Sequence, residues 1–172
     1  MKLILSDRPL SLELEAKDDI VFVDLSTKNI ANCVGCFGCW TKTPGKCVIR
    51  DDATQIYPLI AKSDTLLYVS RIRYGGYDTV MKTMLERAIP IQQAFIRLVH
   101  GETHHIQRNV LPKHAVIVAY GARSEEEQAL FEQLVSRNAH NMNFADYTIR
   151  FTTEEDVQQL VCQEVEIWKK SC

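Results

Sequence analysis

Short apolar runs alternate along the chain with stretches of helical periodicity, and this alternation constrains the fold more than any other feature. Several of the runs are apolar throughout, as expected for strands that are covered on both faces. The predicted strands are residues 3–5, 20–25, 65–69, 115–119 and 147–151. Strands that alternate with helices predict an α/β protein, in which helices cover both faces of a parallel sheet in a three-layer sandwich.

Helices are predicted where polar caps precede apolar residues at a spacing near 3.6. Their expected starts are Asp51, Asp78, Ser124 and Thr153. Ser124 and Glu127 form a capping-box pattern. Four apolar side chains in this third helix are expected to form its buried stripe: Leu130, Phe131, Leu134 and Val135.

Two connections depart from regular alternation. Residues 6–19 join the first two strands, and the alternating sequence of residues 10–14 leaves room for one or two helical turns at most. This predicts a shortened first crossover. Residues 88–113 are longer than most ordered connections and include Phe95 and Leu98 among few charges. We expect this insertion to pack against another subunit.

Composition limits the classes of function. The chain has 172 residues, 46% of them hydrophobic and 24% charged, so we expect one domain, residues 1–172. A net charge of -2 gives no reason to expect nucleic acid or an anionic membrane as a partner. The amino terminus lacks a signal-peptide pattern, and no apolar run is long enough to span a membrane. A cytoplasmic location is therefore expected.

Four cysteines lie close together in the spacing C-x2-C-x2-C-x7-C. They are Cys33, Cys36, Cys39 and Cys47. In a reducing compartment a disulfide framework is disfavoured. Three interpretations stay open: a [4Fe–4S] cluster, a four-thiolate zinc site, or a cluster-free loop whose cysteines pack near a ligand. Cys162 and Cys172 fall in the last helix and the tail, and we assign them no function.

Ligands in open parallel sheets bind beyond the carboxyl ends of the strands. The cysteine loop, residues 70–77 and residues 120–123 each follow a predicted strand. Gly75 and Gly76 would let the backbone approach a planar ligand between two tyrosines. An ordinary strand-to-helix turn with surface tyrosines is the alternative.

Several motifs together resemble the flavodoxin-fold NAD(P)H-dependent FMN reductases, especially the branch that includes the iron–sulfur flavoproteins. They are the cysteine cluster with Trp40, Pro44-Gly45-Lys46 and Asp51-Asp52, then Tyr74-Gly75-Gly76-Tyr77 with Met81-Lys82 and Leu85-Glu86-Arg87, then Gly101-Glu102 with His104-His105. The resemblance implies a flavodoxin-like, five-stranded sheet in the order 2-1-3-4-5 and one FMN per site. It also implies homodimers or tetramers with sites near the subunit interfaces.

The resemblance also implies which residues bind the cofactor. They are Ser6, Arg8, Ser11, Trp40, Ser70, Arg71, Ile72, Tyr74, Gly75, Gly76, Tyr77, Tyr120, Gly121 and Ala122. The loop after the first strand departs from the glycine- and serine-rich phosphate loop of the family, because it has no glycine and carries Asp7. We therefore expect residues 74–77 and 120–122, facing Trp40, to dominate flavin recognition.

The expected function is an FMN-dependent oxidoreductase that transfers electrons from NAD(P)H to a small acceptor, a quinone or another flavin. No catalytic side chain is required, because the flavin supplies the chemistry. Two alternatives stay open. One is an electron carrier with FMN and an iron–sulfur cluster, and the other is a cofactor-free, degenerate flavodoxin-like partner protein.

Overall fold

Five long strands form the parallel sheet in the computed structural model, which describes residues 1–99 and 101–170 and so leaves Cys172 outside the described part. They are β1 (Lys2–Ser6), β2 (Ile20–Asp24), β3 (Thr65–Arg73), β7 (Lys113–Tyr120) and β8 (Phe144–Thr152). Their spatial order is β2-β1-β3-β7-β8, and every neighbouring pair is parallel. Counted along the chain, this is the predicted order 2-1-3-4-5. The flavodoxin-like α/β prediction is confirmed.

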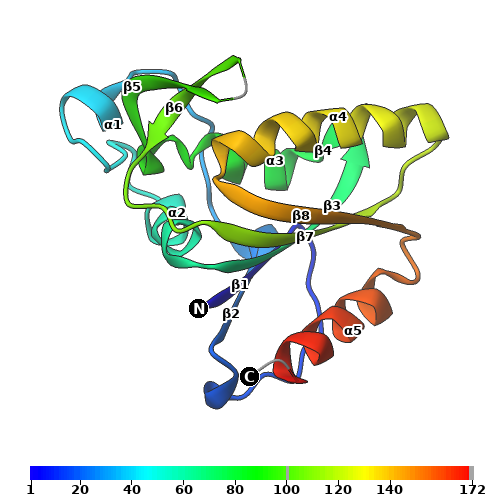
Figure 1. The fold of residues 1–172 in the computed structure, drawn as a ribbon. Coiled ribbons are helices and arrows are strands. Elements are labelled where there is room, and N and C mark those ends of the chain that lie inside the picture. Colours follow the sequence, from blue (N-terminus) through cyan, green and yellow to red (C-terminus); the bar gives the residue numbers. More distant parts are fainter. Residues whose placement is uncertain (100, 171–172) are drawn as a thin grey trace.

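Apolar side chains cover both faces of the sheet because successive residues of a strand point to opposite faces. Leu3 and Leu5 of β1 belong to the core under α2 (Ala53–Lys62), α3 (Thr79–Glu86) and α4 (Glu125–Asn141). Ile4, between them, belongs to the core under α5 (Val157–Lys170). Figure 1 shows α5 on one side of the sheet and α3 and α4 on the other.

The first crossover is short, as predicted. Its helical content in the structure is η1 (Ala16–Asp18), a single 3-10 turn. Leu10, Leu12 and Leu14 pack against the α5 side of the sheet, while Ser11 and Glu13 between them are exposed. An extended segment therefore covers the face that a helix covers in a regular strand–helix–strand unit. The alternating sequence is explained by this half-buried extended conformation.

Two of the predicted helix starts, Asp78 and Ser124, carry side-chain caps, whereas α5 begins at Val157 and not at the predicted Thr153. Asp78 accepts a hydrogen bond from the Thr79 N–H at 2.7 Å, and Ser124 accepts one from the Glu127 N–H at 3.2 Å. The predicted stripe of α4 is half wrong, because Leu130 and Leu134 are 54% and 39% exposed. These two leucines face the turn after β3 and a groove beside α3 rather than the sheet. No helix within the described residues is both long enough and apolar enough to cross a membrane.

The long insertion folds as a hairpin of β5 (Gln92–Val99) and β6 (Glu102–Gln107), preceded by η3 (Ile89–Ile91). The hairpin stands apart from the main sheet beside α1 (Gly38–Thr41), as Figure 1 shows. Three of its apolar side chains are largely exposed: Phe95 at 69%, Ile96 at 62% and Leu98 at 78%. Such an apolar surface is typical of a region that contacts another protein.

Candidate functional site

The crevice between β1 and β3 is the topological switch point of this sheet, the place where such folds bind ligands. In this chain the carboxylate of Asp7 closes it. The Arg71 N–H donates to Asp7 Oδ2 at 2.6 Å, and the Tyr120 hydroxyl donates to Asp7 Oδ1 at 2.8 Å. The Asp7 N–H donates in turn to the Val69 carbonyl at 3.0 Å. One short side chain thus ties together the carboxyl ends of three adjacent strands.

Two arginines flank the ring of Tyr120. The guanidinium carbons of Arg8 and Arg71 lie 5.3 and 5.4 Å from the ring centroid, within the range of cation–π contacts. Glu154, just after β8, forms an ion pair with Arg71, and its Oε1 lies 3.8 Å from Nη1 of Arg8. The two positive charges are therefore matched by two carboxylates, Asp7 and Glu154.

Burial dominates the electrostatics of this cluster. It raises the pKa of Asp7 above its usual value, while hydrogen bonds from Arg71 and Tyr120 oppose the rise. Burial also raises the pKa of Tyr120, and the nearby Asp7 carboxylate adds to that rise. Tyr120 therefore stays a neutral donor toward the carboxylate at physiological pH.

The serines of the loop after β1 that were expected to bind the cofactor form hydrogen bonds within the protein. Ser6 is fully buried, and its hydroxyl donates to the Arg8 carbonyl at 2.7 Å and accepts from the Arg8 N–H at 3.2 Å. Ser11 lies against α5, where its backbone exchanges hydrogen bonds with the Gln158 side chain. The loop after β1 therefore presents no set of backbone donors converging on an empty site.

The turn of residues 74–77 packs closely on α4. Tyr74 and Gly75 both have positive φ, 53° and 70°. A Cβ added to Gly75 would lie 2.6 Å from the Leu130 Cβ, so only glycine fits there without a shift. Tyr74 is 83% exposed with Arg123 over its ring, whereas Tyr77 is buried edge-on against Phe131.

The remaining predicted cofactor residues at this edge lie in or beside the turns that follow β3 and β7. Ser70 and Ile72 of β3 are buried, and the Ser70 hydroxyl donates to the Arg71 carbonyl. Gly121 has a φ of 75°, and a Cβ there would lie 3.3 Å from the Arg71 Cγ. Ala122 packs on the core beneath α4. The structure thus brings the turns after β3 and β7 side by side at the carboxyl edge.

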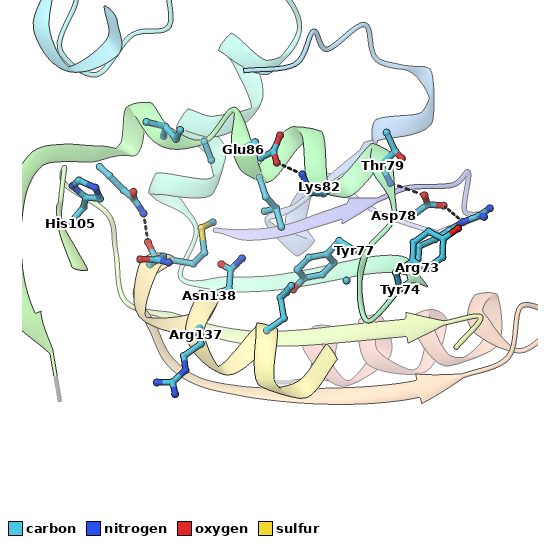
Figure 2. A pocket seen from close by; sticks show the side chains of 18 residues that line it. Arg73, Tyr74, Tyr77, Asp78, Thr79, Lys82, Glu86, His105, Arg137 and Asn138 are labelled. Carbon is cyan, nitrogen blue, oxygen red and sulfur yellow. Dashed lines mark hydrogen bonds and ion pairs between the residues drawn. The ribbon is translucent and has the colours of Figure 1, made fainter. Parts of the chain in front are cut away.

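A groove of about 830 Å³ begins at this edge and runs between α3, α4 and the hairpin (Figure 2). Such a volume is typical of sites for small organic ligands. Its lining includes Tyr77, Leu85, Leu134, Asn138, Asn141 and His105. Charged side chains stand along it: Figure 2 shows Lys82 paired with Glu86 on α3, and Arg137 on α4.

Sequence analysis missed most of the groove, although a signal for it exists. Leu134, Arg137, Asn138 and Asn141 follow the spacing i, i+3, i+4, i+7 and so share one face of α4. His105 lies at the hairpin end of the groove, and its Nδ1 is buried with no hydrogen-bond partner among the described residues. The groove is therefore mainly apolar, with charged side chains along it and His105 as a polar group at the hairpin end.

The cysteine loop does not lie where we expected it. Trp40 was expected to face the turn of residues 74–77. Its indole instead stacks on His105 at a centroid distance of 4.6 Å and donates to the Gln92 carbonyl. Arg87, at the end of α3, holds the loop through Asp51, the Ala31 carbonyl and the Cys47 sulfur. These contacts, which we call the Arg87–Asp51 clamp, hold the cysteine loop against the end of α3.

The four clustered cysteines are free thiols in the structure. Cys33 and Cys36 are exposed, and Cys39 and Cys47 are partly buried. Burial raises the pKa of Cys39, and the neighbouring Cys47, Cys33 and Cys36 add to that rise. The thiols are thus near one another, but no three Cys, His, Asp or Glu side chains among the described residues converge as metal ligands. This arrangement does not fit a cluster or a zinc ion.

Comparisons with known proteins agree with the resemblance seen in the sequence. No protein-family model matches the chain. The chain is 37% identical over 68 residues to an iron-sulfur flavoprotein of Archaeoglobus fulgidus, covering 40% of this chain and 30% of that protein. It is 31% identical over 74 residues to an iron-sulfur flavoprotein of Methanocaldococcus jannaschii, covering 43% and 37%. The match thus spans about a third of the length of these curated relatives.

Solved structures share the whole fold at low sequence identity. An FMN-dependent NADH-azoreductase from Bacillus anthracis, in complex with FMN, has a TM-score of 0.55 at 11% identity and covers 99% of both chains. An NAD(P)H:quinone oxidoreductase from Methanothermobacter marburgensis has a TM-score of 0.58 at 10% identity, covering 98% of this chain and 96% of that one. These similarities confirm the flavodoxin-like fold.

Proposed function

We propose that this protein is an FMN-dependent oxidoreductase that passes electrons from NAD(P)H to a small acceptor, a quinone or another flavin. The observation that carries the proposal is the pair of glycine-containing turns, after β3 and β7, at the carboxyl edge of a 2-1-3-4-5 sheet. The printed names of the similar proteins support the same chemistry, since they include an FMN-dependent NADH-azoreductase and iron-sulfur flavoproteins.

The isoalloxazine part of a flavin fits the residues at this edge. Tyr74, Gly76 and Tyr77 line the start of the groove, which has the volume of a small-molecule site, while Gly75 and Gly121 let the turns pack closely on Leu130 and Arg71. In the proposed site these residues, with Ser70, Arg71, Ile72, Tyr120 and Ala122, hold the ring and exclude water. A bound flavin would accept hydride from the nicotinamide and pass electrons on.

The phosphate part of FMN does not fit the loop after β1. Asp7 already accepts both converging donors, and Ser6 and Ser11 are bonded elsewhere. We therefore assign flavin recognition to the ring rather than to the phosphate.

The groove is the proposed place for the acceptor. Its apolar walls suit a flat, weakly polar molecule such as a quinone. Two of the cations that line it, Lys82 and Arg137, are already paired with Glu86 and Glu102, so the proposal rests on the apolar walls.

The closure of the switch point by Asp7 favours a second candidate, a cofactor-free partner protein with a flavodoxin-like fold. In that case the carboxylate stabilises a sheet edge that needs no ligand. An iron–sulfur electron carrier is suggested by the names of the relatives, but the arrangement of the thiols offers no ligand set. We derive no electron-transfer step through a cluster.

We propose that the protein acts as a homodimer or tetramer in the cytoplasm. The exposed apolar side chains of the hairpin, Phe95, Ile96 and Leu98, would be covered in such an assembly. Phe37 and Val34 of the cysteine loop are also largely exposed.

The visible absorption spectrum of the freshly purified protein tests these alternatives. Flavin bands, together with oxidation of NADH or NADPH that depends on an added quinone, would support the reductase. Flavin bands with broad additional iron–sulfur absorption would support the carrier. A colourless protein that binds neither FMN nor riboflavin would support the cofactor-free partner.

A further inference from the structure

Asp7 occupies the position at which a sheet of this topology offers a ligand site. The crevice at the switch point between β1 and β3 is flanked by Ser6, Val69 and Ser70, which are all fully buried. We propose that the Asp7 carboxylate is a built-in substitute for the phosphate of a ligand. The residue then determines specificity: it excludes phosphate from the crevice and selects a flavin that is held by its ring. The flavin part of this inference rests on the proposed function.

The donors around Asp7 are those that an anionic ligand would require. A backbone N–H and a phenolic O–H converge on the carboxylate from β3 and β7, at 2.6 and 2.8 Å. Such charge-assisted hydrogen bonds are short and about twice as strong as neutral ones. The guanidinium groups of Arg8 and Arg71 both lie over the ring of Tyr120, the hydroxyl donor.

Charge explains why this donor set does not accept phosphate as well. Around the crevice, the positive charges of Arg8 and Arg71 are offset by Asp7 and Glu154. A third carboxylate, Asp78, is near enough to raise the pKa of Asp7 further. A phosphate dianion brought beside the ionised Asp7 would face repulsion at short range, and the two donors that converge there are already bonded to Asp7.

Removal of the carboxylate should reverse this selection. Asp7→Ser frees the Arg71 N–H and the Tyr120 O–H, shortens the side chain and removes one negative charge. The crevice then holds two donors and two arginines, opposed by Glu154 and Asp78. Asp7→Asn is the conservative variant: it removes the charge but keeps the volume, so a smaller effect is expected.

Inorganic phosphate is the direct probe of this crevice. Thermal unfolding is measured in sodium phosphate and in sodium chloride at equal ionic strength, because a ligand that binds only the folded state raises the unfolding temperature. We expect phosphate-specific stabilisation of Asp7→Ser, less of Asp7→Asn, and none of the wild type. Glu155→Gln is the matched control, since it removes one exposed carboxylate at the same sheet edge and should respond as the wild type does.

Flavin titration provides the second readout. By fluorescence quenching, Asp7→Ser should shift the preference for FMN over riboflavin by about tenfold or more relative to the wild type, which corresponds to about 1.4 kcal/mol. Glu155→Gln should leave the preference unchanged.

The two readouts separate the inference from the function on which it rests. If phosphate stabilises the Asp7 variants but no form of the protein binds flavin, the role of Asp7 stands and the reductase proposal fails. If flavins bind and phosphate affects neither Asp7→Ser nor Asp7→Asn, the role of Asp7 is overturned and the reductase proposal stands. Equal phosphate stabilisation of the wild type would also overturn it.

Discussion

Arg87 and Asp51 form a buried, bidentate ion pair that holds the cysteine loop at the end of α3. Nη1 and Nη2 of Arg87 donate to the two carboxylate oxygens at 2.6 and 2.9 Å, and the two side chains are only 1% and 9% exposed. Asp51 also accepts hydrogen bonds from the Ala31 and Ala53 N–H groups. Both terminal nitrogens of Arg87 are therefore paired, whereas its Nε is buried with no hydrogen-bond partner among the described residues.

Breaking this pair should destabilise the protein strongly. Removing one partner leaves the other charge buried and uncompensated, which typically costs about 3–5 kcal/mol. We expect Arg87→Met to lower the free energy of unfolding in urea by about that amount. Lys82→Met is the control, because it breaks an exposed pair with Glu86 on the same helix and should cost about 0.5 kcal/mol or less. A loss below 1 kcal/mol for Arg87→Met would contradict this account of the loop.

Lys113 gives a prediction for the dependence of stability on pH. It is fully buried and donates to the Ser63 carbonyl at 2.7 Å, and burial lowers its pKa from 10.5 to about 8. Between pH 8 and 10.5 the unfolded chain therefore binds more protons than the folded one. The contribution of Lys113 to the free energy of unfolding should rise with pH through this window.

The measurement compares urea unfolding of the wild type and Lys113→Met at several pH values. The difference between the two free energies should grow in favour of the wild type as the pH is raised from 8 to 10.5. Lys62→Met, on the surface end of α2, serves as the control and should show no such trend. A difference that stays constant across the window would show that Lys113 keeps its ordinary pKa.

Gly75 should resist substitution for two separable reasons. Its φ of 70° strains any residue with a Cβ, at a cost of about 1 kcal/mol, and its added Cβ would meet Leu130 at 2.6 Å. We expect Gly75→Ala to destabilise the protein, and to cost less in a Leu130→Gly background, which removes the Cβ that the new methyl group would meet. Gly101, which has a φ of 82° and open space around it, is the control for strain alone. Equal costs for Gly75→Ala and Gly101→Ala would rule out the clash.

Much of the fold could be predicted from the sequence, because the strands are apolar on both faces of the sheet. Leu3, Ile4 and Leu5 are apolar in succession because alternate side chains enter opposite cores. The extended crossover followed in the same way from the alternation of Leu10, Leu12 and Leu14. Strand order, by contrast, came from the resemblance to a family, since periodicity does not determine it.

The placement of the site could be predicted only in part. The turns after β3 and β7 follow directly from strand ends, and the structure places them together. Trp40 could not be placed, because its position depends on the Arg87–Asp51 clamp between segments 36 residues apart. Leu130 and Leu134 have the periodicity of buried residues, yet they face a turn and a groove. Periodicity identifies a face of a helix but not what covers it.

The exposed hairpin leads to a prediction about assembly. Phe95 and Leu98 are 69% and 78% exposed, so replacing them with Ser should not disturb the core of a protomer. If the hairpin forms a subunit interface, the double variant should dissociate to monomers in sedimentation velocity at micromolar concentration. Val80→Ser, at a partly exposed apolar position of α3, is the control. A wild type that is already monomeric would rule out the interface.

Comparing riboflavin with FMN tests the central claim most directly, namely that the chain recognises a flavin by its ring while Asp7 replaces the phosphate. Titration of the wild-type protein with each flavin, followed by fluorescence quenching, gives the two dissociation constants. We predict that both flavins bind and that the two constants agree within about tenfold, or about 1.4 kcal/mol. FMN that binds more than about a hundredfold tighter, near 2.7 kcal/mol, would mean that the loop after β1 is a working phosphate site and would contradict the account.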